Sequence, residues 1–192
     1  MSANPTAPPA YPLKRQWDIT FSGSVSPSGK TKSPAPASSK IIKPPRLLGG
    51  FECVKSMWQL MNNLPPLGRI PIDATIYCFQ RGIDPAWEHP ANTDGGRWMY
   101  SIPAADEDLA ATAWRNLYLD LVGEGLDPTS EVVGIVCARR RNYTRFSVWT
   151  KNKSRGAAIM AIGQLIKADL PPTVALEYQA HGSDYGAYKF VL

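Results

Sequence analysis

Three stretches of the chain carry apolar residues at every third or fourth position, the spacing that lines one face of an α-helix. They span residues 51–61, 109–121 and 157–170. A Pro-Pro-Leu-Gly run after the first stretch and Gly123 after the second are typical helix stops. The pattern therefore predicts three helices, each with one apolar face to bury.

Around these helices, apolar residues alternate with polar ones or form short β-branched and aromatic runs, as strands do. The predicted strands cover residues 17–21, 74–79, 97–102, 131–139, 144–150, 173–180 and 188–192. Short strands separated by single helices predict an α+β fold, with a mainly antiparallel sheet and the helices packed on one face. The other face is left to bind a ligand.

The predicted strand with the sequence RFSVW shows how the two faces differ. Side chains alternate along a strand, so Phe146 and Val148 share one face. Arg145, Ser147 and Trp149 share the other. We expect the first set to face the core and the second set to face the ligand.

The beginning of the chain differs in composition from the rest. Residues 1–10 are mostly Pro, Ala, Ser and Thr with little to bury, which predicts a disordered tail before a single domain over residues 11–192. Inside that domain, residues 22–45 form a long Pro- and Ser-rich loop that carries Lys30, Lys32, Lys40 and Lys43. Loops of this length in a compact domain are usually functional or disordered.

The net charge of +5 is distributed unevenly. Residues 1–51 hold seven basic side chains and one acidic side chain, Asp18. Residues 139–155 hold seven basic side chains and no acidic one: Arg139, Arg140, Arg141, Arg145, Lys151, Lys153 and Arg155. Two positive regions predict a polyanionic ligand, although the run of three arginines also suits a solvated hairpin end.

Cys53, Cys78 and Cys137 lack the spacing of metal ligands, so we expect buried thiols, no metal site and no cofactor. The apolar runs are too short to cross a bilayer, and the Pro-rich start has no apolar signal core. These features predict a soluble cytoplasmic protein with no membrane partner.

Trp87 and Glu88 stand side by side just after a proline, between two predicted strands. A tryptophan ring attracts a positively charged base such as 7-methylguanine, and a carboxylate can accept two N–H bonds from the guanine edge. Arginines then bind the phosphates that follow the base. A packing anchor at Trp87 and a solvated acid at Glu88 are the alternatives. An acid/base pair of Glu88 and His89 is disfavoured because neighbours on an extended segment point apart.

As a set, the fragments YPLKRQW, FECVKSMW, IDPAWE, GGRW, AWRNLYLDLVGE and FSVWTK resemble the eukaryotic translation initiation factor 4E family of mRNA cap-binding proteins. The resemblance extends from about Tyr11 to Leu192. It implies a curved sheet with three helices on its convex face and a cap slot on its concave face.

The resemblance also implies roles for particular residues. Trp87 would stack on 7-methylguanine, Glu88 would accept from its N1 and N2 groups, and Trp149 would lie against the methyl group. Arg140 and Arg145 would bind the cap phosphates. The family's second stacking tryptophan is missing between Asp18 and Met57. We hypothesise that one of four residues replaces it: Ile41, Ile42, Tyr185 or Tyr188.

On the helical face, the family binds a scaffold or repressor peptide with a Tyr-x4-Leu-apolar motif. The positions that match this surface are Tyr11, Pro12, Leu13, Val54, Trp58, Leu119 and Gly123. Arg115 and Asn116 depart from the family's pattern, which predicts an altered partner peptide.

We therefore predict a monomeric cap-binding protein that recruits a scaffold of the initiation factor 4G type to capped mRNA. The alternatives are a cap-binding translational repressor, a general single-stranded RNA-binding module and a cap-processing enzyme.

Overall fold

The computed structural model describes residues 11–23, 44–127, 129–182 and 188–192. The predicted tail, nearly all of the predicted loop over residues 22–45, and the hypothesised lid residues Ile41, Ile42 and Tyr185 lie outside the described residues. The side chain of Tyr188 lies outside them as well.

Eight strands form one sheet in the order β2-β1-β3-β5-β6-β4-β7-β8, and each neighbouring pair is antiparallel. The strands are β1 (Pro12–Ser22), β2 (Arg46–Cys53), β3 (Thr75–Gln80), β4 (Gly96–Pro103), β5 (Val132–Arg139), β6 (Tyr143–Thr150), β7 (Glu177–Ala180) and β8 (Tyr188–Val191). The helices are α1 (Val54–Asn63), α2 (Glu107–Val122), α3 (Gly156–Ala168) and the short 3-10 helix η1 (Leu67–Arg69).

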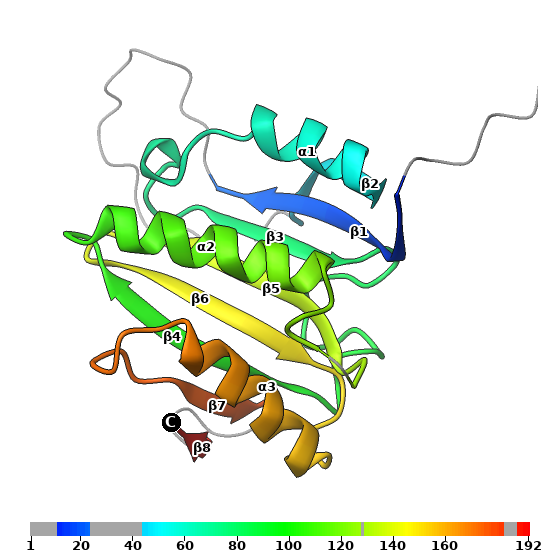
Figure 1. Ribbon diagram of the computed structural model, residues 1–192, viewed down its shortest axis with the longest axis vertical. Coiled ribbons are helices and arrows are strands. Elements are labelled where there is room, and N and C mark those ends of the chain that lie inside the picture. Colours follow the sequence, from blue (N-terminus) through cyan, green and yellow to red (C-terminus); the bar gives the residue numbers. More distant parts are fainter. Residues whose placement is uncertain (1–10, 24–43, 128, 183–187) are drawn as a thin grey trace, which may run out of the picture.

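All three α-helices lie across the same face of the sheet, with α1 near β1, α2 across the middle and α3 near β7 (Figure 1). The main apolar core fills the space between them, and Phe146 and Val148 are completely buried in it. The predicted fold class is confirmed: a curved, antiparallel sheet with three helices on its convex face.

The start of the first helix was predicted wrongly. Phe51 belongs to β2, a strand that the sequence pattern did not predict, and it pairs with Trp17 of β1. The helix begins at Val54, because Cys53 caps it: the Cys53 Sγ accepts from the Ser56 backbone N–H at 3.5 Å. Phe51 is apolar at a helical spacing but packs as a strand residue, so tertiary pairing overrides the local pattern.

Trp98 fixes helix α3 on the sheet. Its ring is completely buried, and its Nε1 donates a hydrogen bond to the Ile159 carbonyl oxygen at 2.9 Å. The helix approaches the ring at Gly163, where an added Cβ would lie 2.3 Å from a ring carbon of Trp98. Only a residue without a side chain therefore allows this approach.

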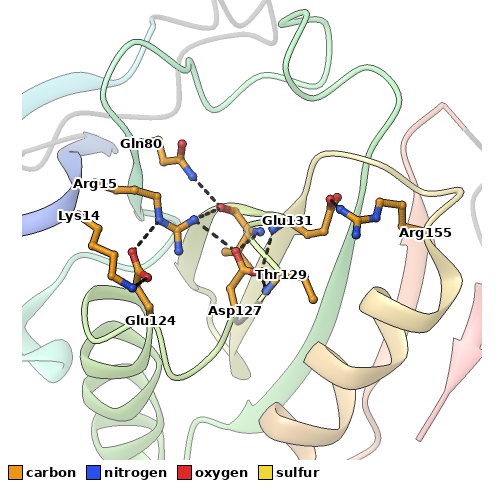
Figure 2. Close-up of polar contacts among 9 residues, drawn as sticks. Lys14, Arg15, Gln80, Glu124, Asp127, Thr129, Glu131 and Arg155 are labelled. Carbon is orange, nitrogen blue, oxygen red and sulfur yellow. Dashed lines mark hydrogen bonds and ion pairs between the residues drawn. The ribbon is translucent and has the colours of Figure 1, made fainter.

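Asp127 is the centre of a buried polar network before β5 (Figure 2). Its side chain is 2% exposed. One carboxylate oxygen accepts from the backbone N–H groups of Thr129 and Glu131, at 3.2 and 2.9 Å. The other accepts from the Val132 N–H at 2.7 Å and from Arg15 Nη1 at 3.2 Å. These bonds hold β1 against the turn that leads into β5.

Two further contacts extend this network (Figure 2). Gln80, the last residue of β3, donates to the Val132 carbonyl oxygen at 2.8 Å. Glu131 is 1% exposed and forms an ion pair with Arg155, just before α3. The network therefore joins β1, β3 and the start of α3 through one turn.

We predict that Gly163→Ala lowers the free energy of unfolding by about 1–3 kcal/mol, because the new methyl group overpacks the Trp98 ring. Urea denaturation followed by circular dichroism measures this change. Gly156→Ala is the matched control: among the described residues its Cβ would meet only a Phe190 ring atom, at 3.9 Å, so we expect unchanged or slightly higher stability. Equal stability of the two variants would contradict the packing argument.

We also predict that Asp127→Asn lowers the free energy of unfolding by about 1–3 kcal/mol at neutral pH. Burial alone would raise the pKa of Asp127, but the hydrogen bonds from Glu131, Val132, Thr129 and Arg15 outweigh it and lower the pKa. A lowered pKa stabilises the fold above the unfolded-state value of about 3.9, and this contribution is lost as the pH falls through the folded-state value.

Urea denaturation at several pH values should therefore show that the difference between wild type and Asp127→Asn shrinks below about pH 4. Asp94→Asn is the control, since that exposed side chain makes no hydrogen bond or ion pair within the described residues. A constant difference at every pH would show that the charge of Asp127 does not contribute.

Candidate nucleic-acid interface

The concave face has a small apolar cluster of its own, separate from the main core. Phe79, Val133, Val136 and Trp149 form it. The Trp149 ring meets the Phe79 ring edge-on, with ring centroids 5.4 Å apart. The centroids of the Trp149 and His181 rings are 4.3 Å apart. Trp149 thus occupies the face opposite Phe146 and Val148, as the alternation of strand β6 predicted.

The loop between β3 and β4 carries Trp87 and Glu88 and is held by hydrogen bonds inside it. Asn92 is completely buried, and its Nδ2 donates to the carbonyl oxygens of Asp84 and Ala86 at 2.9 and 2.8 Å. Further backbone bonds close turns through the loop, such as Asn92 N–H to the His89 oxygen at 2.8 Å. These hydrogen bonds therefore give the loop a defined conformation, although it contains no helix or strand.

This loop lies at the same end of the sheet as Trp149. Ile83, near its start, packs against the concave cluster that contains Trp149. At its other end, Gly95 lies so close to β6 that an added Cβ would be 2.0 Å from the Thr150 carbonyl oxygen. Within the described residues no ring contact joins Trp87 to Trp149, and it is Ile83 that connects the loop to the cluster.

Trp87 and Glu88 are both exposed on this ordered loop. Trp87 is 54% exposed, although a tryptophan ring is the side chain that gains most from burial. Glu88 makes no hydrogen bond or ion pair within the described residues. The loop therefore presents an uncovered ring and an unpaired carboxylate next to each other.

The two predicted phosphate-binding arginines lie on either side of the β5–β6 hairpin. Arg140 is held towards β3, where it donates to the Ala74 carbonyl oxygen at 3.1 Å and to Thr75 Oγ1 at 3.3 Å. Arg145 is held towards β4, where its Nε donates to Ser101 Oγ at 3.4 Å. Neither arginine forms an ion pair with a carboxylate of the described residues, so both charges can attract an anion.

Arg139 has a different role from its neighbour. Its Nη1 donates to the carbonyl oxygens of Leu67, Gly68 and Ile70, which form the turn around η1. A guanidinium bound to three carbonyl oxygens stabilises that turn and has fewer donors left for a ligand. Neighbouring arginines of this run therefore differ in role: Arg139 stabilises the turn around η1, whereas the charge of Arg140 can attract an anion.

Sequence reasoning missed Arg97 as a candidate for this face. Arg97 pairs with Trp149 across β4 and β6, and its guanidinium carbon lies 6.0 Å from the Trp149 ring centroid. Its Nη2 donates to Gln179 Oε1 at 3.3 Å. The available signal was alternation: Trp98 is in the main core, so Arg97 before it must point to the concave face.

His181 lies beside Trp149 and is almost buried. Burial, together with the positive charges of Arg97 and Lys153, lowers its pKa to about 4. The imidazole is therefore neutral at physiological pH, and the positive charge beside it comes from Arg97 and Lys153.

The residues predicted for a partner surface come from three segments that meet on the helical side. Tyr11, Trp58 and Leu119 are exposed, with relative accessibilities of 79%, 44% and 37%. The Tyr11 carbonyl oxygen accepts from the Val54 N–H at 3.1 Å, which joins the residue before β1 to α1.

The first residues of β1 also reach the end of α2. Lys14 forms an ion pair with Glu124 at 2.7 Å, and Glu124 follows Gly123, the residue that ends α2. Pro12 is exposed and Leu13 packs partly against the main core. The predicted surface residues are thus neighbours in the fold, and their binding role stays a prediction.

Other predictions concern sites of other kinds. The three cysteines are free and buried, as expected. No group of three or more metal-ligating side chains occurs among the described residues. In the described part of the chain, no helix has the length and apolar content needed to cross a membrane.

Comparisons with known proteins agree with this architecture. The family model "Eukaryotic initiation factor 4E" matches residues 12–189. Eukaryotic translation initiation factor 4E-1 of Oryza sativa subsp. japonica is 32% identical over 179 residues, which cover 93% of this chain and 73% of the rice protein.

Two solved structures are similar to this chain. Caenorhabditis elegans eIF4E-3, in complex with the 4E-binding protein Mextli and a cap analog, has a TM-score of 0.78 and 25% identity, covering 95% of this chain and 99% of that one. Ascaris suum eIF4E-3 with m7G cap has a TM-score of 0.80 and 22% identity, covering 95% and 97%, and shares the fold. The match of the family model over nearly the whole chain, with the rice relative, shows that the chain belongs to the eukaryotic initiation factor 4E family.

Proposed function

We propose that this protein binds the 7-methylguanosine 5′ cap of mRNA in the cytoplasm and recruits a scaffold protein for translation initiation. The observation that carries the proposal is the exposed pair Trp87 and Glu88, held on an ordered loop at the Trp149 end of the concave face. The C. elegans relative, solved with a cap analog and a 4E-binding protein, supports both parts. Membership in a family of initiation factors makes binding, rather than catalysis, the activity to test.

The base would be recognised by the ring and the carboxylate together. 7-Methylguanine is positively charged, so the face of the Trp87 ring attracts it by cation–π interaction as well as by stacking. Glu88 accepts hydrogen bonds from guanine N1–H and N2–H, and its negative charge complements the methylated base. Trp149, held by Phe79 and His181, provides an apolar surface for the methyl group.

The phosphates that follow the base would bind along the β5–β6 hairpin. Arg140 and Arg145 stand on its two sides, and Arg97 adds a third guanidinium beside Trp149. Guanidinium groups bind phosphate oxygens in forked pairs of hydrogen bonds. Because side-chain or backbone oxygens already hold each of these arginines, little ordering is needed when the cap binds.

We expect Trp87→Ala to weaken the binding of 7-methyl-GTP by about 5- to 150-fold, since stacking contributes about 1–3 kcal/mol per base. Glu88→Gln should weaken it at least about 10-fold and reduce the preference for 7-methyl-GTP over GTP, because a charged acceptor is lost. Isothermal titration calorimetry measures both affinities. Trp58→Ala, which removes another exposed tryptophan, is the control and should bind 7-methyl-GTP like wild type. Equal affinity of wild type for GTP and 7-methyl-GTP would contradict the proposal.

For the partner surface, we predict that Trp58→Ala weakens binding of a peptide with the Tyr-x4-Leu-apolar motif by about 30-fold or more, the loss typical of an aromatic anchor. Fluorescence anisotropy of the labelled peptide measures this change. Trp87→Ala is the reciprocal control and should retain the peptide. If Trp58→Ala lost both the peptide and 7-methyl-GTP, Trp58 would have a structural role instead.

A further inference from the structure

A hollow of about 560 Å³ lies in the concave face beside Arg145, and we call it the β4–β7 hollow. It is lined by residues of β4, β6 and β7, of the segment before β7, and of the start of α2, so it extends from the concave face past the edge of β4 to that helix. Its volume is within the range of about 300–1,000 Å³ that is typical of small-molecule sites. None of the predicted base-binding residues Trp87, Glu88 and Trp149 lines it, so it is a separate space on the same face.

The hollow begins where a chain of phosphates would leave the base site. Arg97 and Arg145 both line it, and Arg97 also lies over the Trp149 ring. Arg145 is four residues from Trp149 along β6, which corresponds to roughly 13 Å of strand. A polyphosphate that runs along β6 from a base at Trp149 would therefore arrive at Arg145 and at the mouth of the hollow.

The rest of the lining combines apolar and polar groups, as a nucleoside requires. Met99 on β4 and Val174 before β7 supply apolar surface. Ser101, Glu177 and Gln179 supply hydrogen-bonding groups. The pairing of Met99 with Glu177 across β4 and β7 places an apolar side chain next to a carboxylate on one face. A base could lie against the first and present its polar edge to the second.

Two carboxylates of the described residues line the hollow, Asp106 before α2 and Glu177 on β7, and Glu177 is the one that pairs with Met99 across the sheet. Its side chain makes no hydrogen bond or ion pair with any described residue, so its acceptor oxygens remain available for a ligand. A carboxylate accepts from the amino groups of guanine, adenine or cytosine. Uracil has carbonyl oxygens on both sides of its single N–H, and these would repel the carboxylate.

We propose that the β4–β7 hollow binds the first transcribed nucleoside of the capped mRNA, and that Glu177 selects a base with an amino group there. Arg145 binds the last phosphate of the bridge, Met99 packs against the base, and Glu177 accepts from its edge. This inference rests on the proposed cap binding and extends recognition beyond the triphosphate.

Calorimetry with three ligands tests the proposal: 7-methyl-GTP, m7GpppG and m7GpppU. The two dinucleotides carry the same charge, so their affinity ratio isolates the second base. We expect wild type to prefer m7GpppG over m7GpppU by about 10-fold or more, and Glu177→Gln to reduce that ratio to about 1. Glu52→Gln on β2 makes the same change in net charge away from the hollow and should keep the wild-type ratio.

A second measurement uses no variant. The methyl resonance of Met99 in an NMR titration should shift more with m7GpppG than with 7-methyl-GTP, since only the dinucleotide carries the second base. Tight binding of 7-methyl-GTP without discrimination between the dinucleotides, or an equal Met99 shift with both ligands, would overturn the role of the hollow alone. Failure of wild type to bind 7-methyl-GTP at all would overturn the cap-binding proposal and this inference with it.

Discussion

The alternation of side chains along β6 is the constraint on which both the core and the candidate interface depend. Phe146 and Val148 point into the core beneath the helices, so Arg145 and Trp149 must point to the concave face. A slip of one residue in the strand register would reverse all four. Pairing of β6 with β4 then places Arg97 beside Trp149. The β5–β6 hairpin and strand β4 thus position both the apolar and the cationic groups of the concave face.

The loop that carries Trp87 shows how a fold can keep a large apolar ring in water. Asn92 is buried within the loop and holds its turns, and Gly95 allows the loop to approach β6 closely. Because the loop is held in this shape, the ring and the neighbouring Glu88 are already placed before a ligand binds. In the proposed cap complex, binding would then cost little ordering, and a base that covers the exposed ring would add apolar burial to the electrostatic attraction.

The positive charges of this protein are not equivalent, although they look alike in sequence. Arg15 and Arg155 each form an ion pair with a buried carboxylate, so they stabilise the turn before β5. Arg139 binds the carbonyl oxygens around η1. Arg140 and Arg145 are held by neutral oxygens and keep their net charge for the concave face. Structural support by neutral groups is what allows a cation to be both fixed in place and attractive to phosphate.

Helical periodicity located α2 and α3 to within a few residues, and strand alternation placed Trp149 on the correct face, because both patterns depend only on near neighbours in the chain. The resemblance singled out Trp87 and Glu88 as a pair. Strand β2 was missed because two glycines interrupt its pattern and its partner β1 lies far back in the sequence. By itself the sequence determined which side chains share a face of an element. Only the tertiary structure decided that Arg139 supports a turn and that Arg97 joins Trp149, because both depend on the order in which distant strands pair.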